Sequence, residues 1–295
     1  MQQQRVWPGL ISAIIPVAGF PNGFDQIDTW TESTSLRNFE LIFVNDSSDY
    51  EVEKKLEEIA SKLRDRLNVK ILTSNSRNPG GSRNIGLSSA EGSWIVFWDC
   101  DDIPDPLRVF EMIRKAEEEK SDVTFGSYQI RSSSSQSIEI KKINEVGKMF
   151  ESVAINPGLW RFAFKSEIAK DTAFPELSMA EDQIFLAEIL FKSPRLQYFN
   201  EIVYEYWNYP VGQLTKDKNK LCDLSLALDY FYRKYESTKC QPLLIAIVRL
   251  TVTAIKKLNF LDGFALAARL IRFAIFHPKQ MKKILKTFIL IWSFR

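Results

Sequence analysis

The segment Trp94–Asp102, with the sequence WIVFWDCDD, is an apolar run that ends in three carboxylates. Consecutive apolar residues are typical of a strand buried on both faces of a sheet. The acids that follow it, Asp99, Asp101 and Asp102, repel one another, and proteins commonly offset such repulsion with a cation. Oxygen ligands favour Mg²⁺ or Mn²⁺, which can hold a diphosphate. The alternative is a solvated turn whose aspartate caps a helix beginning near Pro106.

Apolar runs and helical stretches alternate before this segment, as expected for an α/β domain with a largely parallel sheet. The expected earlier strands are Leu10–Val17, Phe39–Asn45 and Val69–Thr73. The expected helices between them are Asp25–Leu36, Tyr50–Leu67 and one that starts near Gly80. In such sheets ligands bind at the carboxyl ends of the strands, so the residues that follow each run are the candidates for a site.

The pattern becomes helical toward the end of the chain. A helix over Pro106–Lys120 precedes Asp122–Arg131 and a serine-rich loop or hairpin at residues 131–137, and a further helix is expected over Glu181–Phe191. The last helices are expected at Leu221–Tyr235, at Leu243–Lys257, at Asp262–Phe276 and from Pro278 onward. The sequence therefore predicts an α/β domain with a C-terminal helical extension.

Composition is that of a folded globular protein, with 295 residues, 45% hydrophobic and 26% charged. Three cysteines without a Cys-x-x-Cys pair indicate neither a disulfide framework nor a zinc cluster, which fits a reducing cytoplasm. No signal peptide is evident at the start, and basic residues interrupt every long apolar stretch, so a conventional membrane span is not expected.

Charge is unevenly distributed along the chain. Residues 241–295 hold ten Lys or Arg against one acid, Asp262, so this part carries +9 and the remainder −7. Basic helices with apolar faces can lie in a membrane interface, and we expect peripheral membrane contact through residues 243–295. The alternative is a helical subdomain packed on the catalytic domain or on a second subunit. Nucleic acid is not expected as a partner, because no recognised binding motif accompanies the charge.

Three other polar segments follow predicted strands or open predicted helices. Asn45–Ser48 ends the second strand, and Asp46 there could accept hydrogen bonds from a nucleoside or cap the next helix. Asn78–Gly86 is a glycine-rich turn with Arg83, suited to a phosphate or simply joining strand to helix. Ala180–Gln183 places two acids in a first helical turn, where the helix dipole alone would stabilise them.

Taken in order, these segments resemble the inverting family 2 glycosyltransferases with the GT-A fold. The resemblance covers about residues 10–215 and also includes Ile14–Val17, Tyr204–Tyr206 and Gly212–Thr215. It implies a Rossmann-like nucleotide-binding sheet with helices on both faces. Residues 1–218 would form the catalytic domain, with about 1–130 binding the nucleotide sugar and about 131–218 on the acceptor side. Residues 219–295 would form a basic amphipathic helical extension.

The resemblance also implies roles for single residues. The residues expected to bind the nucleotide sugar are Pro16, Asp46, Asn78, Arg83, Asp99 and Asp101. Asp99 and Asp101 would hold Mn²⁺ or Mg²⁺, with Asp102 as a possible third acid. Asp182 matches the catalytic base and Glu181 is its neighbour. Trp160 lies on the acceptor side, where a ring can stack on a sugar or pack in the core. A family histidine is absent, because Tyr206–Tyr209 has none.

The implied reaction moves a hexosyl or N-acetylhexosaminyl group from a nucleotide-diphosphate sugar, by family prevalence a UDP-sugar, to an acceptor hydroxyl. The expected setting is synthesis of a cell-surface polysaccharide or a lipid-linked glycan at the cytoplasmic face of the membrane. Two alternatives stay open: a nucleotidyltransferase, and a degenerate glycosyltransferase-like partner at the membrane. The sequence leaves the donor, the acceptor, the linkage and the oligomeric state undetermined.

Overall fold

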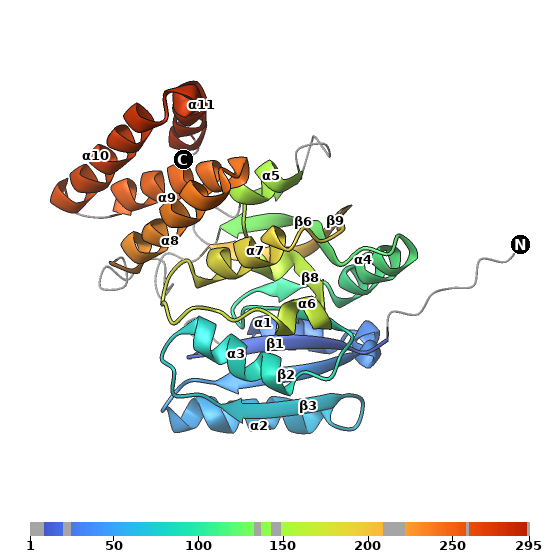
Figure 1. Cartoon of the computed structure of the whole chain (residues 1–295). Helices are drawn as coiled ribbons and strands as arrows, with labels where there is room; N and C mark the ends of the chain where they lie inside the picture. The colour runs from blue at the N-terminus through green and yellow to red at the C-terminus, as the bar shows by residue number, and fades with distance from the viewer. Residues whose placement is uncertain are drawn as a thin grey trace, which may run out of the picture.

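The structure is a computed structural model that describes residues 9–19, 25–132, 137–142, 149–208, 222–257 and 260–293 (Figure 1). Two predicted features fall wholly or partly beyond these ranges. The segment Gly212–Thr215, which contributes to the family resemblance, lies outside the described residues, and so do residues 133–136 of the serine-rich connection.

The described strands form one mixed sheet in the order β3-β2-β1-β4-β8-β6-β9-β5, with β7 paired to β6. The first four in this order are parallel, β8 is antiparallel to both of its neighbours, and β9 is parallel to β6. Their bounds are β1 Ile11–Val17, β2 Phe39–Asn45, β3 Asn68–Thr73, β4 Trp94–Phe97, β5 Ile103–Pro104, β6 Val123–Ser132, β7 Ile138–Lys141, β8 Phe162–Lys165 and β9 Leu196–Asn208.

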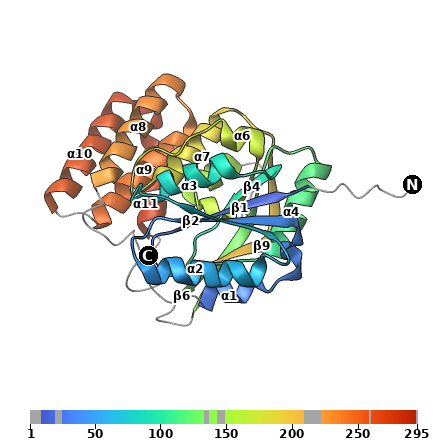
Figure 2. The same cartoon turned by 90° about the horizontal axis from the view of Figure 1, so that it is seen from below.

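Helices cover both faces of the sheet, as Figure 2 shows from below. One apolar core joins the sheet to α1 (Asp25–Thr31), α2 (Tyr50–Leu63) and α4 (Pro106–Glu118). A second core, on the opposite face, joins it to α3 (Pro79–Ser89), α5 (Met149–Ile155), α6 (Ser166–Lys170) and α7 (Glu181–Phe191). Short 3-10 turns, η1 (Thr34–Asn38) and η3 (Leu159–Arg161), lead into β2 and β8.

The predicted α/β class, with helices on both faces and a helical extension, is confirmed, and the four early strands match to within one residue. The expected helix Asp25–Leu36 is shorter, because α1 ends at Thr31 and a separate 3-10 turn follows. Ser and Thr compete with helical hydrogen bonding and favour such breaks. Beyond β4 the sheet is mixed rather than parallel, which the first hundred residues do not foretell.

The C-terminal helices α8 (Cys222–Thr238), α9 (Gln241–Lys257), α10 (Phe260–Phe276) and α11 (Pro278–Ser293) form a layer at one end of the sheet (Figure 1). α9 is its centre and contacts α5, α8, α10 and α11. Most apolar residues of α9 are buried, so packing accounts for its hydrophobicity. Within the described ranges, no helix is both long and apolar enough to cross a membrane.

Close packing of α3 against β1 depends on Gly86. A Cβ atom at this position would lie 2.4 Å from Cγ2 of Ile14, a fully buried residue of β1. Real atoms do not approach so closely, so the helix would have to move away from the sheet. Since the first turn of α3 carries candidate site residues, this contact fixes part of the site.

We predict that Gly86→Ala lowers the thermal unfolding temperature. Overpacking a core costs about 1–3 kcal/mol, which exceeds the roughly 0.5–1 kcal/mol that alanine gains over glycine in a helix. The matched control is Gly263→Ala in α10, where the new Cβ would meet Ile255 at an ordinary 3.6 Å. Thermal melts followed by circular dichroism should show a loss for the first variant and no loss for the second. Equal shifts would contradict the close packing.

Candidate active site

The carboxyl ends of β1, β2 and β4 lie side by side and bring the candidate residues together. β1 is the central strand of the three, paired in parallel with β2 on one side and β4 on the other. The main chain continues the pairing past the strand ends, where Asp46 N–H donates to the Val17 carbonyl at 2.8 Å. Asp46 and Asp99 therefore follow strands that flank Pro16, as the parallel topology predicts.

Arg83 joins the donor side of this site to the predicted base helix. It lies in α3, is only 7% exposed, and pairs through Nη2 with Oδ1 of Asp99 at 3.0 Å. Its Nη1 pairs with Oε1 of Glu181, at the start of α7, at 2.7 Å. The two carboxylates come from the ends of β4 and α7, so one guanidinium holds both elements in register.

Gly80 allows this approach of α3 to the chain around α7. A Cβ at Gly80 would lie 2.8 Å from the carbonyl oxygen of Pro175 and 3.1 Å from Cγ of Glu181. The side chain of Asn84, one turn further along α3, exchanges hydrogen bonds of 2.9 Å with both main-chain groups of Phe174. Residues 174–181 are thus held directly against the first two turns of α3.

Three carboxylates act on the charge of Arg83. Burial works against the charge on Arg83, but Asp99, Glu181 and Asp182 outweigh it and hold its pKa above the ordinary value. Burial raises the pKa of Glu181, and repulsion from Asp182 adds to it while Arg83 opposes it. A buried ion pair of this kind is costly to break, because a single unpaired charge would remain in the interior.

Asp182 is the second residue of α7, and the residue that precedes the helix, Ala180, is left-handed. Ala180 has φ 64° and ψ 13°, a conformation that L-residues other than Gly, Asn and Asp seldom adopt. Oδ1 of Asp182 accepts a hydrogen bond from the N–H of Gln183 at 2.8 Å. Burial raises the pKa of Asp182, while Arg83 and Arg249 oppose that rise. A carboxylate made more basic in this way is better suited to accept a proton near neutral pH.

Arg249 reaches this region from α9 and was not among the predicted site residues. Its Nε donates to the carbonyl of Ala154 at 2.9 Å, and its Nη2 donates to Oε1 of Gln183. Burial lowers its pKa to about 10, with the charge of Asp182 opposing. A lone arginine on the otherwise apolar face of a predicted helix was the signal in the sequence that could have identified it.

The acid run after β4 divides into two kinds of residue. Asp99 and Asp101 are half-buried at the site, whereas Asp102 is buried and accepts a hydrogen bond from the N–H of Trp207 at 2.7 Å. The N–H of Asp99 donates to the hydroxyl of Tyr204 at 3.0 Å. Asp102 and Tyr204 thereby fasten the acid run to β9, which gives Asp102 a structural role in holding its neighbours.

Crowding leaves Asp101 with a perturbed carboxyl group. Burial raises its pKa from 3.8 to about 6, and repulsion from Asp99 adds to this. In the described part of the chain no group of three or more His, Cys, Asp or Glu side chains is arranged to hold a metal ion. Mg²⁺ is nonetheless commonly bound by one or two carboxylates together with substrate phosphates. Asp99 and Asp101 fit that donor set, since a cation would relieve their repulsion.

The side chains of Asp46 and Asn78 are engaged in local structure. Asp46 accepts from the hydroxyl of Ser76 and from the N–H of Arg77, each at 3.2 Å. Asn78 caps α3, because its Oδ1 accepts from Gly81 N–H at 2.7 Å. These bonds order the chain between β3 and α3 beside the site, and direct contact of either residue with a nucleotide stays a prediction.

Trp160 lies in a cluster of aromatic rings beside β6 and β9. Its ring stacks on Tyr204 with centroids 4.5 Å apart and on Tyr206 at 5.7 Å, and meets Tyr128 edge-on at 4.6 Å. Packing therefore accounts for this tryptophan in part. The residue is only half-buried, and stacking on a sugar stays a prediction.

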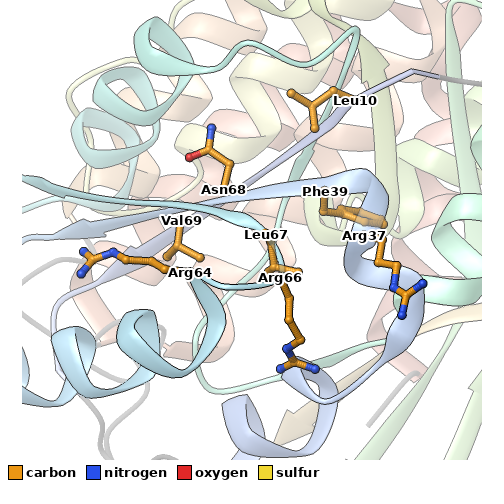
Figure 3. A pocket seen from close by; sticks show the side chains of 8 residues that line it. All are labelled: Leu10, Arg37, Phe39, Arg64, Arg66, Leu67, Asn68 and Val69. Carbon is orange, nitrogen blue, oxygen red and sulfur yellow. The ribbon is translucent and has the colours of Figure 1, made fainter.

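A basic pocket of about 590 Å³ lies at the other edge of the sheet, by the amino ends of β1, β2 and β3 (Figure 3). Arg37, Arg64 and Arg66 contribute to its lining, together with Asn68 at the start of β3. Figure 3 shows the three guanidinium groups spread apart rather than converging on one point. The pocket is separate from the acid run, which follows the carboxyl end of β4.

The fold and this site define a GT-A domain. Solved structures share its architecture: Staphylococcus aureus TarS 1-349 in complex with UDP-GlcNAc has a TM-score of 0.61 at 16% identity, covering 96% of this chain and 90% of that one. The mannosyltransferase PcManGT from Pyrobaculum calidifontis, in complex with GDP-Man and Mn²⁺, has a TM-score of 0.55 at 14% identity, covering 98% and 88%.

The sequence comparison gives the family. The family model for glycosyl transferase family 2 matches residues 25–177, just over half of the chain, and the chain belongs to this family. It is similar to the poly(ribitol-phosphate) beta-N-acetylglucosaminyltransferase TarS of S. aureus, at 28% identity over 186 residues. That match covers 57% of this chain and 30% of the relative, so less than a third of the curated relative's length is represented.

We predict that Asp101 makes stability depend on pH in the metal-free protein. The folded carboxyl keeps its proton up to about pH 6, whereas the ordinary value is 3.8, so the folded state binds more protons between these values. Stability contributed by this group is therefore full below pH 3.8 and is lost as pH rises through 6. Asp101→Asn should abolish this loss, and its advantage over the wild type should widen up to pH 6 and then stay constant.

Thermal melts with a chelator at several pH values between 4 and 8 check this prediction. Asp65→Asn, at an exposed position after α2, is the matched control and should follow the wild type throughout. A constant difference between Asp101→Asn and the wild type across this range would show that the carboxyl is not perturbed.

Proposed function

We propose that the chain is an inverting glycosyltransferase that moves a hexosyl or N-acetylhexosaminyl group from a nucleotide-diphosphate sugar to an acceptor hydroxyl. The observation that carries this proposal is the Arg83 bridge, which sets the acid run after β4 beside the start of α7. Family membership and the fold shared with nucleotide-sugar complexes support it. UDP is the proposed nucleotide, because the solved relative TarS was crystallised with UDP-GlcNAc.

In the proposed reaction Asp182 accepts the proton of the acceptor hydroxyl. The hydroxyl oxygen forms a bond to the anomeric carbon as the bond to the diphosphate oxygen breaks, and the electron pair leaves with the nucleoside diphosphate. One in-line displacement inverts the anomeric configuration. Burial raises the pKa of Asp182 while Arg83 and Arg249 oppose the rise, and a carboxylate of raised pKa is better suited to take the proton.

Asp99 and Asp101 would hold Mg²⁺ or Mn²⁺, which supplies charge stabilisation for the departing diphosphate. Asp102, which accepts a hydrogen bond from the N–H of Trp207, would keep this pair in place. Pro16, Asp46 and Asn78 would border the nucleotide, since they belong to the ends of β1 and β2 and to the start of α3. We assign residues 1–218 to the catalytic domain and 219–295 to the helical extension.

The acceptor is proposed to be a growing cell-surface polysaccharide or a lipid-linked glycan. The curated relative TarS acts on poly(ribitol-phosphate), which supports a cell-surface polymer. Trp160 would be the ring on the acceptor side that contacts a sugar. The proposed location is the cytoplasmic face of the membrane, where nucleotide sugars are supplied.

We predict that the protein releases nucleoside diphosphate from one member of a panel of nucleotide sugars in the presence of Mn²⁺ or Mg²⁺. Asp182→Asn should lower the rate by about 10²–10⁴, the usual contribution of a general base. Asp101→Asn should lose the metal-dependent release, and Asp65→Asn should behave as the wild type. The measurement is the rate of nucleoside diphosphate release by each variant, with and without the metal ion.

The same assay separates the alternatives. Release of pyrophosphate in place of nucleoside diphosphate would identify a nucleotidyltransferase and overturn the proposal. Donor binding without turnover in any lipid or polymer extract would identify a non-catalytic partner instead.

We also propose that the C-terminal layer contacts the membrane surface through α10 and α11. Large apolar side chains on these helices are 43–69% exposed. They are Phe264, Ile271, Ile275, Phe276, Met281, Leu285, Ile289, Leu290 and Trp292. Lys282 and Lys286 are exposed beside those of α11, an arrangement suited to anionic headgroups above an acyl boundary.

We predict that the protein sediments with vesicles containing anionic lipid and less with neutral ones. The double variant Lys282→Glu and Lys286→Glu should weaken this binding at least about tenfold, because each basic residue near an anionic surface contributes about 1 kcal/mol. The matched control, Lys54→Glu and Lys62→Glu, reverses two exposed charges on α2. Equal loss in both double variants, or no binding to either vesicle, would argue against a specific face.

A further inference from the structure

A second cavity lies between the predicted base helix and the C-terminal layer. It has a volume of about 380 Å³ and is lined by residues of α5, α7, α8 and α9 and of the turns beside them. That volume falls in the range of about 300–1,000 Å³ typical of small-molecule sites. No step proposed above uses this cavity.

The wall formed by α7 is a single apolar stripe. Leu186, Ala187 and Leu190 line the cavity at the spacing of one helix face, and Gln183 occupies the preceding turn of the same face. From Gln183 to Leu190 a helix rises about 10 Å. The cavity therefore extends along two turns of α7, and it is called the groove below.

The opposite wall comes from α9 and is polar only at one end. Leu243 and Ala246 face the groove, and Arg249 follows them one turn later. Since Arg249, in the middle of α9, bonds to Gln183, the charged end of this wall meets the beginning of α7. Pro242, from the other end of the α9 wall, lines the groove together with Ser193, just beyond α7.

Among the described residues that line the groove, Arg249 is the one with a charged side chain. Its guanidinium donates to a carbonyl and to an amide oxygen, both neutral acceptors, and the charge of nearby Asp182 also acts on it. Its neighbour Gln183 adjoins Asp182, the proposed base, in the sequence. An anionic group would complement this charge, while the rest of the groove offers apolar contacts.

We propose that this groove binds the aliphatic chain of an anionic amphiphile, with the phosphate or other anionic head at Arg249 and the chain extending along α7 toward Ser193. This inference rests on the proposed function and names the acceptor class: a glycan carried on a lipid phosphate, with the acceptor hydroxyl beyond the phosphate and toward Asp182. Charge complementarity at Arg249 and the apolar stripe on α7 select a molecule with both parts. Neither a free phosphate nor a neutral alcohol fulfils both.

The test is calorimetric titration of the full chain with decyl phosphate below its micelle concentration. We expect saturable binding of decyl phosphate, at least tenfold weaker binding of decanol, and no measurable binding of inorganic phosphate. Ala187→Trp, which fills the groove, should weaken binding of decyl phosphate at least tenfold. Leu226→Trp, on the exposed side of α8, is the matched control and should bind as the wild type does. Arg249→Met should reduce decyl phosphate binding to the level of decanol.

A labelling experiment covers the case in which a groove variant fails to fold. Decyl phosphate with a photoreactive group at the chain end should label the wild type within residues 186–193 or 240–246. Labelling confined to α10 or α11, or a lack of saturable binding by the wild type, would overturn the inference. Nucleoside diphosphate release is measured separately without amphiphile, so failure of the groove and failure of the proposed transferase activity are distinguishable.

Discussion

The paired contacts of Arg83 with Asp99 and Glu181 are the interaction on which the site depends. Each carboxylate belongs to a different layer of the structure: one ends a central strand, and the other begins a helix on the opposite half of the chain. A buried guanidinium is costly without such partners, so Arg83 and the buried Glu181 depend on each other for their place in the interior. Gly80 follows from this demand, because a side chain there would meet the Pro175 carbonyl and Glu181 and keep the two backbones apart.

Repulsion between carboxylates is concentrated at the carboxyl end of β4. Burial and the nearby charge of Asp99 raise the pKa of Asp101, while a hydrogen bond from Trp207 holds Asp102 to β9. Folding alone would favour fewer acids here, and the chain keeps them where a cation and a diphosphate would convert repulsion into attraction. Sites built for charged ligands commonly retain such unfavourable groups when empty.

The sequence was sufficient for the strands, for most helices and for the convergence of acids at the strand ends. Apolar runs identified β1 to β4, and parallel topology then required Asp46 and Asp99 to lie at one edge. It was not sufficient for contacts between distant segments. The partner of Arg83 in α7 is 98 residues away, and Arg249 meets Gln183 across 66 residues. Local pattern carries no information on such pairs, and the same is true of the contacts of Trp207 and Tyr204 with the acid run.

The bond between Arg249 and Gln183 has an evolutionary consequence. A terminal extension is often regarded as a module that can be exchanged between enzymes while the catalytic unit stays constant. Here the extension supplies a charge to the neighbourhood of Asp182 and shares an apolar core with Met179 and Ile184. Recombination at the proposed boundary between the two parts would therefore have to bring an equivalent arginine with it, so the two parts are expected to be inherited together.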